Sequence, residues 1–193
     1  MRGGGATGMM DLAYLSNLVA HWQRRGIRSG PGLTDAEVER VERRFGWLFP
    51  DDLLMLLRFA LPTSKGFPDW RSGREETLRA SLEWPQEGLR SSIECGDLWL
   101  DSWGARPIEL AEALPIARHA VRRAPTLIPI YSHLYLPAEP MLPGNPVFSV
   151  HGADTIVYGN DLAAYLHHEF EMPLPEWAAP SPRPIPFWTE LAG

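Results

Sequence analysis

The histidines of the C-terminal half, with a nearby carboxylate, offer the residue types of a metal site. His133 and His151 lie on or near predicted strands, and Asp154 follows His151 after a short loop. Two imidazole nitrogens and a carboxylate oxygen suit zinc, but a site requires that the ligands converge. The sequence does not indicate convergence, and the helical run His167-His168-Glu169 is not an HExxH arrangement. We interpret these histidines as surface or partly packed residues and predict no metal.

A nucleophilic cysteine or serine finds little support in the residue pattern. Cys95 has Glu94 and Asp97 beside it, and neighbouring negative charge disfavours the thiolate that a catalytic cysteine requires. The sequence has no Gly-x-Ser-x-Gly turn, and its only lysine, Lys65, lies in a predicted loop. It also lacks a glycine-rich turn that would hold a phosphate. We predict that the protein is not an enzyme and binds no cofactor.

An acidic, tryptophan-rich stretch between Glu75 and Glu112 is the main candidate for binding. It holds nine acidic residues against three arginines, in a chain whose net charge is −6. Aromatic side chains supply binding energy at interface centres, and charges set association rate and selectivity. The stretch would suit a protein partner, possibly a basic toxin domain, and would repel nucleic acid. The candidate residues are Glu83, Trp84, Glu87, Glu94, Asp97, Trp99, Asp101 and Trp103.

The same stretch has a structural interpretation. In that alternative the three tryptophans belong to the core and the carboxylates to an ordinary solvated surface.

The segment Phe67-Pro68-Asp69-Trp70-Arg71 also has two interpretations. It could contact a partner, or it could form a structural corner in which the aromatics are buried and Arg71 hydrogen-bonds carbonyls, which we favour.

Three helices are predicted in the N-terminal third, over residues 10–25, 34–46 and 50–61. The first ends at Gly26, and residues 29–33 form a Gly/Pro connector. Thr34 and Glu37 make a capping box for the second helix, which ends near Gly46. Pro50 and two following carboxylates open the third helix, which Pro62 ends.

The middle of the chain gives weaker patterns. Ser72 and Glu75 form a possible capping box for a short helix that ends at about Leu82. Residues 83–104 have no clear periodicity, so we predict only a segment that covers the core. Residues 107–124 are predicted to be helical, with a break at Pro115 because proline removes an interior hydrogen bond.

Strands dominate the later part of the chain. Leu127–Tyr131 is a predicted strand, and Pro129 within it indicates an edge or a bulge. Residues 146–151 and 155–158 form a predicted hairpin, followed by a helix over 161–170. Helices first and antiparallel strands later predict an α+β fold, a mostly antiparallel sheet packed against several helices. Residues 173–186 contain six prolines and form a predicted strap, docked by Phe187 and Trp188.

Composition narrows the class of protein. No apolar run approaches the roughly 18 residues of a membrane span, and the N-terminus has no secretory pattern. A single cysteine fits a reducing cytoplasm, and the strong excess of arginine over lysine suggests a GC-rich bacterial genome. We therefore expect a cytoplasmic protein that contacts no membrane and no small-molecule substrate. We divide it into a leader and helix (1–29), a central α+β domain (30–172) and a proline-rich strap (173–193).

An ordered set of short motifs resembles the SUKH superfamily, also called the Smi-one/Knr-four family. The set covers roughly residues 30–170. Its pieces are Leu33-Thr34-Asp35-Ala36-Glu37, Phe45-Gly46, Phe49-Pro50-Asp51-Asp52-Leu53, Phe67-Pro68-Asp69-Trp70-Arg71, Leu127-Ile128-Pro129-Ile130-Tyr131, Gly144-Asn145-Pro146-Val147-Phe148-Ser149-Val150 and Ile156-Val157-Tyr158-Gly159. The residues that we take as family markers are Pro50, Asp69, Trp70, Arg71, Gly144 and Pro146.

The resemblance implies a helix-covered, mostly antiparallel sheet without a catalytic site. Bacterial members of the family resemble immunity proteins, which bind and neutralise a cognate toxin of a polymorphic toxin system. Fungal members resemble regulators of cell-wall synthesis that act through protein contacts. We expect a non-catalytic protein-binding module of the immunity type. The alternatives are a regulatory scaffold related to the cell-wall regulators and, less favoured, a metal-dependent hydrolase.

Overall fold

A four-stranded antiparallel sheet lies at the centre of the computed structural model, which describes residues 10–193. Its strands follow one another in the order of the sequence: β3 (Leu127–Tyr131), β4 (Leu134–Pro137), β5 (Val147–His151) and β6 (Asp154–Gly159). A second antiparallel pair consists of β1 (Ser29–Pro31) and β2 (Ala60–Pro62). Strand β4 was not predicted from the sequence.

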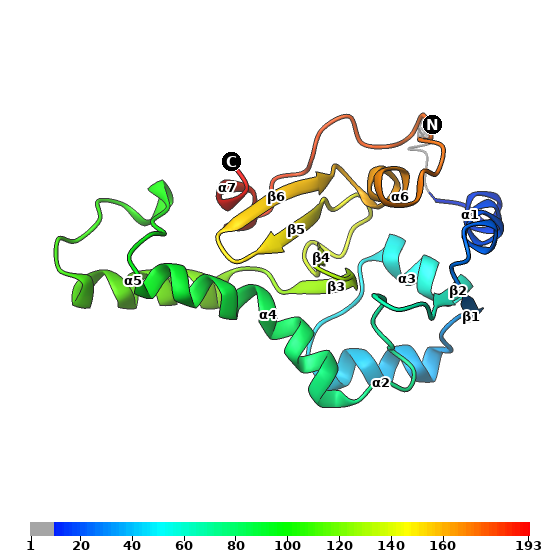
Figure 1. Cartoon of the computed structure of the whole chain (residues 1–193), viewed down its shortest axis with the longest axis horizontal. Helices are drawn as coiled ribbons and strands as arrows, with labels where there is room; N and C mark the ends of the chain where they lie inside the picture. The colour runs from blue at the N-terminus through cyan, green and yellow to red at the C-terminus, as the bar shows by residue number, and fades with distance from the viewer. Residues whose placement is uncertain (1–9) are drawn as a thin grey trace, which may run out of the picture.

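Seven α-helices and one 3₁₀-helix surround the sheet in the described part of the chain (Figure 1). They are α1 (Leu12–Arg24), α2 (Asp35–Phe45), α3 (Asp51–Phe59), α4 (Glu75–Glu94), η1 (Asp101–Trp103), α5 (Leu110–Arg123), α6 (Leu162–Phe170) and α7 (Trp188–Leu191). The predicted α+β class is therefore confirmed. The segment between α4 and α5, at the left of Figure 1, projects beyond the sheet.

The two faces of the sheet bury two separate hydrophobic cores. Side chains of successive strand residues point to opposite faces, and on β4 this sends Leu134 and Leu136 to the first core and Tyr135 to the second. The first core is completed by α1, α2, α3, α6 and Leu78 at the start of α4, and the second by α5, α7 and the later part of α4, with Leu89 and Ile93. Helix α5 and the later part of α4 thus cover a different face from the N-terminal helices.

The N-terminal helices follow the local sequence signals. In the capping box of α2, Glu37 N–H donates to Thr34 Oγ1 at 3.3 Å, and Thr34 N–H donates to Glu37 Oε2 at 2.8 Å. Gly46 ends this helix with φ of 77°, a conformation that glycine adopts without strain. After α3 the chain pairs Ala60–Pro62 with Ser29–Pro31, so the predicted connector 29–33 contains a short strand.

Helix α4 differs from the prediction in its start and its length. It begins at Glu75 behind Arg74, without a side-chain cap from Ser72, and continues to Glu94 through Pro85. Pro85 has no N–H to donate to the Ser81 carbonyl one turn earlier. The Tyr135 hydroxyl donates to that carbonyl instead, at 3.1 Å. The predicted end at Leu82 is wrong because a tertiary contact replaces the missing helical bond.

Helix α5 is also continuous where a break was predicted. Pro115 lies inside it, and the carbonyl that Pro115 leaves without a helical donor belongs to Ala111, an exposed residue in the first turn.

In the sheet, the expected irregularity at Pro129 is confirmed. Strand β3 lies at the sheet edge, and its register with β4 shifts between Pro129 and Tyr131.

The C-terminal strap packs against the domain at Trp177 and at Trp188. Trp188 is buried, and its Nε1–H donates to the Pro125 carbonyl at 2.7 Å, which confirms the predicted docking. Earlier in the strap, the ring of Trp177 packs edge-on against Tyr14 of α1, with centroids 5.4 Å apart. Helix α1 and the strap therefore both join the cores of the central domain.

Within residues 10–193, no helix combines the length and apolarity that a membrane crossing requires.

Candidate protein-binding surface

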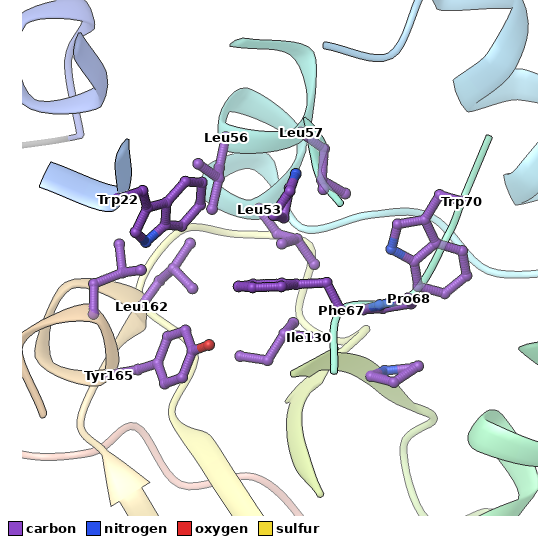
Figure 2. Close-up of a pocket in the computed structure, with 13 residues that line it drawn as sticks. Trp22, Leu53, Leu56, Leu57, Phe67, Pro68, Trp70, Ile130, Leu162 and Tyr165 are labelled. Carbon is purple, nitrogen blue, oxygen red and sulfur yellow. The ribbon is translucent and has the colours of Figure 1, made fainter. Parts of the chain in front are cut away.

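The Phe67–Arg71 segment forms a corner against the first core. Trp70 is 3% exposed and packs edge-on against Phe49, with centroids 5.6 Å apart. Figure 2 shows Phe67, Pro68 and Trp70 around a small cavity that Trp22 and other core residues also line. The cavity measures about 20 Å³, which is room for one water molecule and no larger ligand.

The polar groups of this corner bind other parts of the protein. The Arg71 guanidinium donates to Glu37 Oε1 at 2.7 Å and to the carbonyls of Gly32 at 2.7 Å and Pro31 at 3.1 Å. The hydrogen bonds from Arg71 and from the Thr34 backbone lower the pKa of Glu37 to about 2. The Asp69 carboxylate accepts from the backbone of Arg71. The corner therefore joins the β1–α2 connection to the start of α4.

Pro50, Gly144 and Pro146 lie where α3 meets the turn before β5. Pro50 is the N-cap residue of α3, and Asp52 in its first turn accepts the Gly144 N–H at 2.9 Å. Gly144 has φ of 87°, in the left-handed region that favours glycine. Pro146 directly precedes β5. These three residues position a turn of the backbone.

The acidic candidates of the 75–112 stretch are exposed, but their charge is partly compensated in space. Glu87 pairs with Arg90 at 3.1 Å within α4, and Glu94 pairs with Arg118 of α5 at 3.0 Å. Arg122 of α5 lines the same hollow between the two helices as Arg90 and Arg118. The acidic stretch is therefore interrupted by a basic area that the linear sequence does not reveal.

The three tryptophans of the stretch have different environments. Trp99 and Trp103 are half-buried over the second core, packed edge-on against each other with centroids 5.3 Å apart. The ring of Trp103 also stacks on Phe187 beside α7. Trp84, on α4, is 54% exposed. Of the three, Trp84 thus presents the largest exposed fraction to a partner.

Trp84 lines an open groove of about 690 Å³ between α4 and the sheet. We call this the Trp84 groove; its lining residues are Glu76, Thr77, Ala80, Ser81, Trp84, Ser132, His133, Tyr135 and His151. Glu76, Ala80 and Trp84 follow at intervals of four, which places them on one face of the helix. The exposed carboxylate of Glu87 lies one turn beyond Trp84.

Two contacts hold α4 beside the sheet at this groove. The Tyr135–Ser81 hydrogen bond lies in its wall. Further along, Gly88 lies against Gly152 in the β5–β6 turn, so closely that a Cβ on Gly88 would lie 2.8 Å from Gly152 Cα. The groove therefore depends on a tyrosine and on two glycines that allow the backbones to approach.

The opposite wall contains the two histidines that the sequence offers as metal ligands. His133 follows β3 and His151 ends β5, and their rings lie 4.3 Å apart between centroids. Burial, reinforced by the neighbouring His151, lowers the pKa of His133. Within residues 10–193, no group of three or more His, Cys, Asp and Glu side chains is arranged to hold a metal, so Asp154 does not complete a site. The pair offers ring faces and hydrogen-bonding nitrogens to a ligand.

The sequence pattern alone did not predict that the lining residues of this groove lie together. Trp84 was a candidate, but the histidines were assigned no binding role, and Glu76 and Tyr135 were not candidates. The missing information was strand β4, whose short apolar run Leu134–Pro137 directly follows His133 and could have indicated a strand.

In comparisons with known proteins, no family model, no curated protein and no solved structure matches the chain.

Proposed function

We propose that this protein is a non-catalytic binding module of the immunity type, which neutralises a basic toxin domain by receiving part of it in the Trp84 groove. The observation that carries the proposal is the position of Trp84. This large aromatic side chain is 54% exposed at an open groove, with the exposed carboxylates of Glu76, Glu83 and Glu87 on the same helix. The ordered resemblance to the SUKH superfamily supports the immunity type.

The physical basis is the complementarity between this groove and a basic side chain. An arginine or lysine over the Trp84 ring gains a cation–π interaction of about 0.5–2 kcal/mol. The surrounding carboxylates attract the same charge at longer range and accelerate association. The ring faces of His133 and His151 extend the aromatic wall. The lone cysteine further leads us to place this activity in the cytoplasm.

A regulatory scaffold of the cell-wall-regulator type is the second candidate, because the same groove would also serve a partner that is not a toxin. Growth separates the two functions. Expression of an isolated toxin partner stops growth and co-expression of this protein restores it, whereas a scaffold partner is harmless alone.

The test compares three forms of the full chain: wild type, Trp84→Ala, and Glu83→Gln combined with Glu87→Gln. Each is used to capture partners from the native cell, and the purified partner is then studied by binding kinetics at low and moderate salt. We expect Trp84→Ala to weaken binding at least about tenfold, as for a central aromatic residue. The charge variant should slow association and reduce its salt dependence.

Matched controls are available on other surfaces. Leu12 is 69% exposed on α1, so Leu12→Ala removes an exposed apolar side chain away from the groove. Glu139 and Glu176 are exposed, so Glu139→Gln combined with Glu176→Gln removes the same number of charges elsewhere. A partner that binds Trp84→Ala and wild type equally, or whose association ignores both salt and the α4 charges, contradicts the proposal.

A further inference from the structure

A cleft of about 750 Å³ lies beneath the proline-rich strap, away from the residues of the Trp84 groove. The apolar part of its wall comes from Leu142, Leu162, Ala163, Trp177 and the prolines of the strap. Concave, mostly apolar spaces of about 300–1,000 Å³ with a few polar groups are typical of small-molecule sites. The size and lining of this cleft therefore place it in that class.

Two buried carboxylates line the cleft from different elements. Asp52, in the first turn of α3, is 6% exposed, and its oxygens accept the N–H groups of Leu53 and Gly144, each at 2.9 Å. Asp161, the N-cap residue of α6, is 5% exposed and accepts from Ala164 at 2.7 Å and Ala179 at 2.6 Å. Each carboxylate lies at the N-terminus of a helix and accepts two backbone N–H groups.

Within residues 10–193, neither carboxylate has a cationic partner. No Lys, Arg or His of residues 10–193 forms an ion pair with Asp52 or Asp161. The cationic residue among the lining residues, Arg183, instead donates to Asn145 Oδ1 at 2.7 Å and to the Pro143 carbonyl at 2.9 Å. Buried charges in proteins are normally paired, so these two stand out.

The electrostatics agree with this geometry. Burial raises the pKa of Asp52, and the negative charge of Asp161 acts in the same direction. The charge of Asp161 therefore disfavours the ionised form of Asp52. A positive charge between them would relieve both the desolvation and the repulsion.

We propose that the cleft binds a small organic cation, an ammonium or guanidinium group on a short apolar body. The charged head lies between Asp52 and Asp161, and the apolar body lies against Trp177 and the strap prolines. This adds a small-molecule ligand to a protein for which the sequence predicted no cofactor and no small-molecule substrate. It is also independent of the proposed function, because none of the residues that line the cleft lines the Trp84 groove.

The experiment uses the full chain and calorimetric titration with phenethylammonium as the probe. Two matched compounds have the same aromatic body: 2-phenylethanol, without charge, and 3-phenylpropionate, with the opposite charge. We expect saturable binding of the cation with Kd below about 1 mM, binding of the alcohol at least about tenfold weaker, and no binding of the anion. Trp84→Ala should bind the cation as wild type does.

Two variants locate the site. Leu142 lines the cleft and is 58% exposed, so Leu142→Arg introduces a competing cation at its mouth without disturbing the core. The matched control is Leu174→Arg, because Leu174 is 53% exposed and does not belong to the lining. Asp161→Asn keeps a capping oxygen and removes a charge. We expect Leu142→Arg and Asp161→Asn each to weaken binding about tenfold or more, and Leu174→Arg to leave it unchanged.

Three results would overturn the proposal. The first is the absence of saturable binding of phenethylammonium. The second is an alcohol that binds as tightly as the cation, which would show an apolar site without charge recognition. The third is unchanged binding in both Leu142→Arg and Asp161→Asn, which would place the ligand elsewhere.

Discussion

The hydroxyl of Tyr135 donates a hydrogen bond of 3.1 Å to the carbonyl of Ser81, the carbonyl that Pro85 leaves without a donor inside α4. One proline thus creates the acceptor by which the long helix is fastened to β4. The bond lies in the wall of the Trp84 groove, so it also fixes one side of the proposed binding site. Pro85 therefore helps to position one wall of the Trp84 groove.

We expect Tyr135→Phe to lower the free energy of unfolding by about 1–3 kcal/mol, because the Ser81 carbonyl then loses its donor. In Pro85→Ala the restored helical N–H competes for that carbonyl, so Tyr135→Phe should have a smaller effect in that background. Chemical denaturation of the four proteins of this double-mutant cycle measures the coupling. Equal effects of Tyr135→Phe in both backgrounds would contradict the link between Pro85 and Tyr135.

The Glu37–Arg71 pair predicts a specific loss of stability in acid. Arg71 and the Thr34 backbone lower the pKa of Glu37 from 4.5 to about 2. A carboxyl group whose pKa is lower in the folded state stabilises the protein above its unfolded pKa and loses this contribution as pH falls through the folded value. The contribution of Glu37 should therefore disappear between about pH 4.5 and about pH 2.

Unfolding measured across that range checks this prediction in wild type and Glu37→Gln. The variant should be less stable at neutral pH, and its stability should fall less steeply between about pH 4.5 and 2. Arg71→Lys should also destabilise, since an ammonium group cannot reproduce the fork that binds Glu37 and the Gly32 carbonyl together. Parallel acid profiles of wild type and Glu37→Gln would show that another carboxylate is responsible.

Truncation to alanine should destabilise the protein strongly at Trp188 and only weakly at Trp84. Trp188 is 1% exposed in the second core, so Trp188→Ala should lower the free energy of unfolding by about 3–5 kcal/mol. Trp84 is 54% exposed, and Trp84→Ala should change stability by less than about 1 kcal/mol. Thermal unfolding of both variants makes the comparison. A large destabilisation by Trp84→Ala would assign this residue to the core.

Gly88 is predicted to be intolerant of a side chain despite its position in a helix. Alanine favours a helix interior by about 1 kcal/mol, but a Cβ at Gly88 would lie 2.8 Å from Gly152 Cα. We expect Gly88→Ala to be destabilising by about 1–3 kcal/mol, because α4 must move away from the β5–β6 turn. Gly30→Ala is the control, since its Cβ meets no atom within 4 Å. Stabilisation by Gly88→Ala would refute the close approach.

Local signals in the amino-acid sequence determine much of the fold. The capping box of α2, the helix end at Gly46 and the β5–β6 hairpin were all predicted, because each depends on residues within a few positions of one another. The α+β class followed from the order of these elements. The failures occurred at α4, whose end was predicted at about Leu82, at α5, where Pro115 predicted a break, and at strand β4, which was not predicted.

Tertiary structure alone decided the candidate binding surface. The sequence places nine carboxylates and three tryptophans in one stretch. It is the packing that leaves Trp84 exposed and Trp99 and Trp103 half-buried. Residues far apart in the chain, such as Glu94 and Arg118, changed the local charge by pairing. Strands β3 and β5 both pair with β4 and end at the same side of the sheet. His133, just after β3, and His151, at the end of β5, are therefore neighbours. Periodicity and capping are local properties of the chain, whereas exposure, pairing and cavities depend on which distant segments pack together.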